Sequence, residues 1–151
     1  MDLQQALPHL LPSAIAWAEA EAKKVAETGT ALTPYEKEIA RSVGVQRPEL
    51  IRIATVERLP LPEDATLSAA AEQTGLLGPG MVGLTLGHAV FICRGRKTRR
   101  LLSHEFRHVH QYEKHGSIAA FLPVYLRQIV EVGYANAPFE ADARAHEIHD
   151  T

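Results

Sequence analysis

A cluster of histidines and glutamates marks the part of the sequence that could do chemistry. Residues 103–115 (SHEFRHVHQYEKH) contain four histidines and two glutamates. The segment HEFRH is an H-E-x-x-H motif, in which His104 and His108 lie one helical turn apart on the same face, so both imidazoles can bind one ion. Zinc binds two such nitrogens at about 2.0–2.1 Å as corners of a tetrahedron. Glu105 leaves the helix about 100° from His104, where it can reach a metal-bound water and act as a general base.

A catalytic zinc site needs a third protein ligand and an open fourth position. The downstream candidates are acidic residues and histidines: Glu131, Glu140, Asp142, His146, Glu147, His149 and Asp150. Glu140 is preferred, because it falls in the first turn of a helix that the chain can return against the motif helix. Asp142 lies about 200° round that helix, and His146 is the alternative ligand. His110 faces away from His108, and His115 is nearly two turns further on.

The motif and its third ligand must be positioned by helices in the last third of the chain. Periodicity predicts a helix over 101–115 that carries the motif. A second helix over 118–132 should be capped by Ser117 and kinked or split at Pro123. Pro138 suits the first position of the final helix, which carries Glu140.

Upstream of the motif we expect a small sheet. Residues 50–56 read as a short strand, and 82–93 as one longer strand that contains Gly83 and Gly87. A short helix over 65–74 should lie between them. The pattern predicts an α+β fold: a mostly helical domain with a small antiparallel sheet packed beside the motif helix.

The N-terminal part is expected to support this core. Residues 13–27 predict a helix, with Gly29 closing it in the left-handed conformation. Thr33 and Glu36 form a capping box at the start of a second helix. We interpret residues 1–151 as a single domain, with 1–45 as helical support and 50–151 as the core that holds the sheet and the metal site.

Bulk properties exclude several classes of function. A chain of 151 residues with a net charge of −2 suits one globular domain and argues against a nucleic-acid partner. Cys93 is alone, so no internal disulfide forms, which fits a reducing compartment. The N-terminus has neither a basic start nor a long apolar run, so we expect a cytoplasmic protein with no membrane partner. Residues 94–100 (RGRKTRR) read as a solvated loop, with contact to an acidic substrate or partner, or to nucleic acid, as the alternative. The oligomeric state stays open.

HEFRH together with PFEADARAHE further on resembles the gluzincin class of zinc metallopeptidases, and residues 82–147 resemble small zincin-like bacterial proteins. By this resemblance His104, His108 and Glu140 would bind Zn²⁺, and Glu105 would be the catalytic base. The resemblance implies a zincin-like fold and a zinc-dependent hydrolase acting on a peptide or protein, with an extended substrate added to the strand at 82–93.

Three details remain open under this resemblance. The oxyanion donor would be one of Tyr112, Tyr125, Tyr134 and His88. Many gluzincins place an aspartate four residues after the ligand glutamate, where this chain has Arg144, so a ligand histidine must be oriented by another group: Asp142, Glu147 or Asp150. The first alternative function is a catalytically inactive zincin-like module that binds metal or regulates a partner. The second alternative is a metal-free interaction domain.

Overall fold

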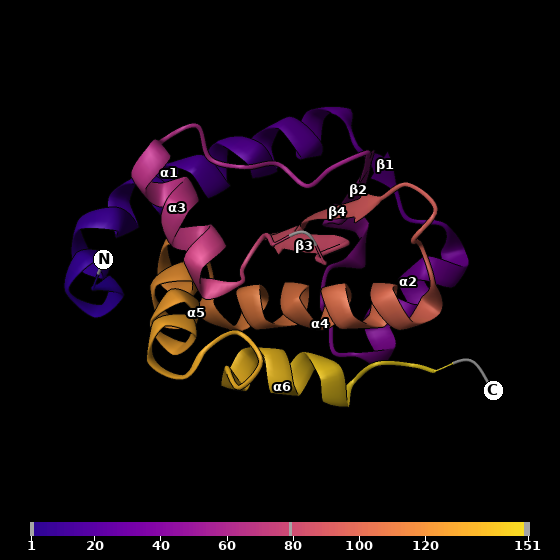
Figure 1. Cartoon of the computed structure of the whole chain (residues 1–151). Coiled ribbons are helices and arrows are strands. Elements are labelled where there is room, and N and C mark those ends of the chain that lie inside the picture. The colour runs from indigo at the N-terminus through magenta and orange to yellow at the C-terminus, as the bar shows by residue number, and fades with distance from the viewer. Residues whose placement is uncertain (1, 79, 150–151) are drawn as a thin grey trace.

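The computed structural model describes residues 2–78 and 80–149 (Figure 1). Its elements follow in the order α1 (Leu3–Thr28), β1 (Thr30–Ala31), α2 (Pro34–Ser42), a 3₁₀ turn (Pro48–Leu50), β2 (Arg52–Val56), α3 (Ala65–Thr74), β3 (Gly83–Leu86), β4 (Ala89–Cys93), α4 (Arg99–His115), α5 (Ile118–Val132) and α6 (Pro138–Ala145). The chain is therefore mostly helical with a small sheet, and the predicted α+β class is confirmed.

The sheet has the strand order β1-β2-β4-β3 and is mixed. β1 pairs with β2, and β3 with β4, in antiparallel fashion, whereas β2 and β4 run parallel. The expectation of an antiparallel sheet is therefore wrong at its centre. The long connection that contains α3 brings the chain to the far edge of the sheet as β3, which runs opposite to β2. The β3–β4 hairpin then reverses the chain, so that β4 lies between β2 and β3 and runs parallel to β2.

The predicted strand over 82–93 is two strands joined by a tight turn. Gly87 and His88 separate β3 from β4, and Gly87 has a φ of 67°, which side chains rarely adopt. A glycine at the first central position is the signature of a two-residue hairpin turn, so this signal was present in the sequence. The turn leaves β3 at an edge of the sheet, next to α4.

α1 begins ten residues earlier than the predicted range of 13–27. The Asp2 carboxylate accepts hydrogen bonds from the N–H groups of Gln4 and Gln5 and caps the helix, which then continues through Pro8 and Pro12. Gly29 is extended, with a φ of −75°, and not left-handed, because the chain passes directly into β1. α1 packs on α5 and on the sheet, while α2 packs on α4.

Side-chain caps define the helices around the site. Thr98 Oγ1 accepts from the Leu101 N–H at the start of α4, and Ser117 caps α5 in the same way. α5 runs without a break through Pro123, so the predicted split does not occur. α6 begins at Pro138 as expected. The capping box of Thr33 and Glu36 is also present.

β4 separates two hydrophobic clusters and so sets the orientation of α4. Val90 and Ile92 face a cluster with α2 and α4, whereas Phe91 faces a cluster with α1, α3 and α5. α4 contributes Phe106 and Val109 to the first cluster. Because these apolar residues turn toward α2 and the sheet, the motif residues between them face α6 and β3.

Candidate metal centre

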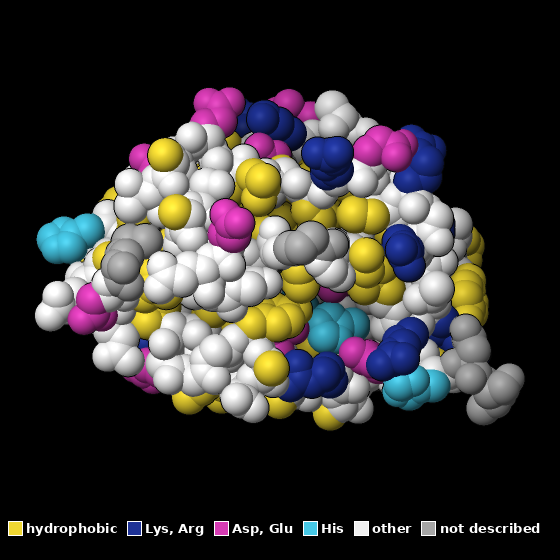
Figure 2. Space-filling view, in the orientation of Figure 1, with side chains coloured by type: hydrophobic (Ala, Val, Ile, Leu, Met, Phe, Trp, Pro, Cys, Tyr) yellow, Lys and Arg dark blue, Asp and Glu magenta, His cyan; other side chains and the backbone are white. Residues whose placement is uncertain are grey.

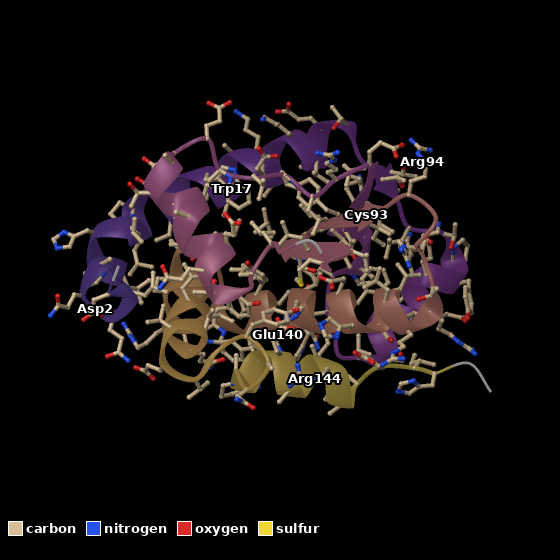
Figure 3. All side chains as sticks on the ribbon, in the orientation of Figure 1. Asp2, Trp17, Cys93, Arg94, Glu140 and Arg144 are labelled. Atoms are coloured by element: carbon tan, nitrogen blue, oxygen red, sulfur yellow. The ribbon has the colours of Figure 1, made fainter. Side chains whose placement is uncertain are left out.

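The three predicted ligands come together although 36 positions separate the first from the last. His104 and His108 extend from α4 and Glu140 from the first turn of α6, and their ligand atoms all lie within 4.8 Å of one another. The His104 Nε2–Glu140 Oε1 distance is 3.2 Å, and the His108 Nε2–Glu140 Oε2 distance is 2.9 Å. Figure 3 shows Glu140 between α6 and α4. The chemistry of this donor set fits zinc, which takes imidazole nitrogen and carboxylate oxygen.

Both imidazoles are oriented by a second hydrogen bond. His104 Nδ1–H donates to Glu147 Oε2 at 2.8 Å, and His108 Nδ1–H donates to Gln111 Oε1 at 2.8 Å. Each ring therefore keeps a proton on Nδ1 and turns Nε2 toward the centre, which is how metal-binding histidines are usually held. Of the three acidic residues that the sequence offered to orient a histidine, Glu147 contacts His104 directly. Asp150 lies outside the described residues.

Gln111 is a residue of the site that sequence reasoning missed. Its Nε2 donates to the Phe139 carbonyl at 3.0 Å and to Asp142 Oδ2 at 2.9 Å, so its Oε1 must face His108. Asp142 in turn accepts from Arg107 Nε at 2.8 Å. Asp142 thus orients a histidine only indirectly. The one available signal was position, since Gln111 lies three residues after His108 on the same face.

Glu140 is buried and ionised. Its side chain is 1% exposed, and Tyr125 donates its hydroxyl hydrogen to Oε2 at 2.7 Å. Burial opposes the charged carboxylate, but hydrogen bonds from His104 and His108 outweigh it and hold the pKa of Glu140 well below its usual range. The carboxylate is thus held in the form that a metal ligand requires.

The electrostatics of the site favour positive charge at its centre. Burial opposes a charged His104, but the hydrogen bond to Glu140 and the charges of Glu105 and Glu140 raise the pKa of His104 to about 9. The pKa of His108 is also raised, because Glu140 and Glu105 outweigh its burial. Glu147 adds a third carboxylate, whose pKa is lowered against the effect of burial by Arg100 and His104. A divalent cation would meet the same field.

Glu105 lies beside the His–His–Glu group without joining it. Its side chain is buried, and Thr85 Oγ1 donates a hydrogen bond to its Oε1 at 2.8 Å. Burial raises the pKa of Glu105, and the charges of His108 and His104 offset only part of this. Gly83 borders the same carboxylate so closely that a Cβ atom there would lie 3.0 Å from Glu105 Oε2. A raised carboxyl pKa suits a proton acceptor that must later act as a donor.

Of the four candidate oxyanion donors, the three tyrosines lie near the candidate metal centre and the histidine does not. Tyr125 contacts Glu140, and Tyr112 and Tyr134 border the same pocket as Glu105. His88 lies elsewhere, because its Nε2 pairs with Glu113 at 2.9 Å in a second cavity, so the structure does not bring it to the site as an oxyanion donor.

Two further sequence candidates lie outside the cluster. The alternative ligand His146 donates from Nδ1 to the Asp142 carbonyl at 2.8 Å and is not part of the ligand group. His110 bonds the Gly44 carbonyl at 2.9 Å, as expected for a side chain that faces away.

The basic segment 94–100 pairs largely within the chain. Arg94 pairs with Glu57, and Lys97 Nζ lies 3.0 Å from Glu36 Oε2. Arg100 Nε lies 2.7 Å from Glu147 Oε1, on the carboxylate that also holds His104. This segment therefore contacts the candidate metal centre through Arg100, a contact that the sequence did not indicate.

The candidate metal centre opens on an apolar pocket of about 110 Å³. Glu105, His108 and Glu140 border one end of it, and the rest is lined mostly by aliphatic side chains. In the space-filling view of Figure 2, a histidine lies below the centre of the molecule, beside acidic and hydrophobic side chains.

In the described part of the chain, no helix combines the length and the hydropathy needed to cross a membrane.

No protein-family model, curated protein or solved structure matches this sequence.

Proposed function

We propose that this protein is a zinc-dependent hydrolase of the peptidase type. The observation that carries the proposal is the convergence of His104, His108 and Glu140 within 4.8 Å, with both imidazoles oriented through Nδ1. Two imidazoles and one carboxylate form a common catalytic zinc set that leaves a fourth position open. The likeness of the two motifs to those of gluzincins supports the same proposal.

The residues around the centre can carry the proton transfers of amide hydrolysis. A bound zinc ion would lower the pKa of its water to about 7 and polarise the substrate carbonyl. Glu105 would accept a proton from the attacking water and pass it to the leaving nitrogen, and its raised pKa strengthens it as the proton acceptor. Thr85 holds Glu105 in place through its hydroxyl. Tyr134 borders the pocket and is the tyrosine we assign to the developing oxyanion.

The edge of the sheet offers a place for a substrate backbone. The Cys93 N–H donates to the Val82 carbonyl, so alternate residues of β3 pair with β4. Gly83 and Thr85 therefore direct their peptide groups toward the outer edge, beside the Glu105 carboxylate. An extended amide or peptide could add to this edge by β-augmentation.

Metal analysis of purified variants tests the proposal. The wild-type protein should hold one zinc ion, and His104→Ala and Glu140→Ala should lose it. His146→Ala is the matched control, because this histidine lies outside the ligand group and its loss should leave the zinc content unchanged. If His146→Ala loses zinc and Glu140→Ala retains it, the proposed ligand set is wrong.

Glu105→Gln separates catalysis from metal binding. We expect this variant to keep its zinc while hydrolysis of casein-derived or other peptides falls by about a hundredfold or more, because amide oxygen is a poor proton acceptor. A zinc-loaded wild-type protein that cleaves no amide would instead favour the alternative of a metal-binding module without turnover.

A further inference from the structure

The pocket beside the candidate metal centre has a strongly uneven lining. Among the described residues of its lining, the carboxylate and imidazole side chains are Glu105, His108 and Glu140. All three belong to the candidate metal centre or lie beside it. Beyond them the walls are largely aliphatic and include Leu7, Leu10, Ala70, Leu76, Leu126 and Ile129. A ligand that enters from the metal centre therefore passes from a polar environment into an apolar one.

The threonine hydroxyls in the lining already have partners. Thr74 Oγ1 donates to carbonyl oxygens of its own helix, including that of Ala70 at 3.0 Å. Thr85 Oγ1 donates to Glu105. Three tyrosines, Tyr112, Tyr125 and Tyr134, also line the pocket, and the Tyr125 hydroxyl donates to Glu140. Away from these hydroxyls, a polar group of a ligand would lose its hydration and gain no charged partner, which disfavours polar ligands.

The pocket is formed between elements and is not a flat surface. Its lining comes mainly from α1, α3, α5 and β3, together with Glu105, His108 and Tyr112 of α4. This enclosure suits a slender occupant more than a folded partner. A pocket with an apolar wall and a few polar groups at one end is typical of sites that bind small amphiphilic ligands.

We propose that this pocket binds an aliphatic chain of the substrate, and that the substrate is an N-acyl amide whose carbonyl lies at the metal centre. This inference rests on the proposed hydrolase function and specifies its substrate class. In the reaction, water oxygen bonds to the carbonyl carbon, the C–N bond breaks, and the water proton passes through Glu105 to the nitrogen. The products are an aliphatic carboxylate and a free amine.

A series of straight-chain hydroxamic acids tests this inference by binding alone. A hydroxamate chelates zinc, so acetohydroxamate reports the metal centre and longer members report the pocket. With the zinc-loaded protein, we expect affinity measured by calorimetry to rise about fourfold for each methylene that the pocket buries, and to level off once the pocket is filled.

Variants of the pocket locate the effect. Ala70→Phe places an aromatic ring in the pocket, and Leu126→Gln adds a polar group to its wall. Both should reduce the ratio of octanohydroxamate to acetohydroxamate affinity by at least tenfold. Ala69→Phe is the matched control, because Ala69 is exposed on the same helix and outside the pocket, and the ratio should stay as in the wild type. If Ala70→Phe does not fold, Leu126→Gln alone still tests the inference.

The outcomes distinguish the two proposals. If acetohydroxamate binds the zinc-loaded protein and chain length has no effect, the acyl-chain inference is wrong while the metal centre stands. If the protein retains no zinc and binds no acetohydroxamate, the proposed hydrolase itself fails. A chain-length effect that is equal in wild type and in both pocket variants would also overturn the inference.

Discussion

The hydrogen bonds behind the imidazoles give the site its most specific residue-level prediction. Gln111→Ala removes the acceptor from His108 Nδ1–H while leaving all three ligands in place. We expect zinc affinity, measured by chelator competition, to fall about 10- to 100-fold. Gln46→Ala, in which an exposed glutamine distant from the ligands is shortened, should leave it unchanged. Equal affinity in wild type and Gln111→Ala would show that Gln111 does not orient the ring.

Proton release on zinc binding is the second prediction at this scale. The pKa of His104 is raised to about 9 by Glu140 and nearby charges, so at pH 7 this imidazole is protonated before zinc binds. Zinc needs the neutral ring and must displace that proton. Calorimetry in buffers of different ionisation enthalpy should therefore detect release of at least about one proton per zinc, and zinc affinity should fall as the pH decreases from 9. Binding at pH 7 without proton release would contradict this charge state.

At the level of single residues, the sequence predicted which three side chains converge better than it predicted the groups that orient them. His104, His108 and Glu140 were found because a one-turn spacing and a helix start are local patterns. Gln111 and Glu147 act through contacts made only when α6 and the following residues return to α4. Such contacts depend on tertiary packing, which no local pattern encodes.

At the scale of elements, the approach of β3 to α4 predicts a role for a glycine. A Cβ atom at Gly83 would lie 3.0 Å from Glu105 Oε2, so Gly83→Ala should displace this carboxylate. We expect amide hydrolysis to fall at least about tenfold with zinc content unchanged. Gly80→Ala is the matched control, because no atom lies within 4 Å of a Cβ placed there. Zinc loss in Gly83→Ala would instead mean that this contact supports the ligands.

The predicted elements were most accurate where capping residues lie close to the helix ends. α3 and α4 begin and end near the expected positions, where Asp64 and Thr98 cap their first turns. α6 begins at Pro138 as expected, but it ends at Ala145, before the expected end at position 150. The strand over 82–93 was wrong because its hydrophobic run continues across the Gly87 turn. The predicted start of α1 was also wrong, because the Asp2 cap and tertiary packing maintain the helix through Pro8 and Pro12.

At the scale of the whole molecule, zinc binding should stabilise the fold because its ligands join α4 to α6. A ligand at about 100 times its dissociation constant adds about 2.7 kcal/mol to the free energy of unfolding. For a domain of this size that corresponds to a rise in Tm of roughly 5–10 °C. Differential scanning fluorimetry with zinc and with a chelator measures it, and His104→Ala should not respond. An equal rise in His104→Ala would place the zinc elsewhere.

The sequence predicted the general architecture, but it did not predict the parallel strand pairing or the apolar pocket. Alternating helical and strand patterns gave the α+β class, while the parallel pairing of β2 and β4 depends on a crossover that spans α3. The apolar pocket likewise forms only where α1, α3 and α5 meet. Each of these helices alone has an ordinary hydrophobic face.

The most direct test of the metal centre is X-ray absorption spectroscopy of the zinc-loaded protein. We predict one zinc with two imidazole nitrogens at about 2.0–2.1 Å, one carboxylate oxygen at about 2.0–2.2 Å and a water in the remaining position. His108→Ala should lose the zinc, as His104→Ala does, and with it this spectrum. Zinc held by four protein ligands with no water, or a spectrum unaffected by loss of His108, would contradict the account.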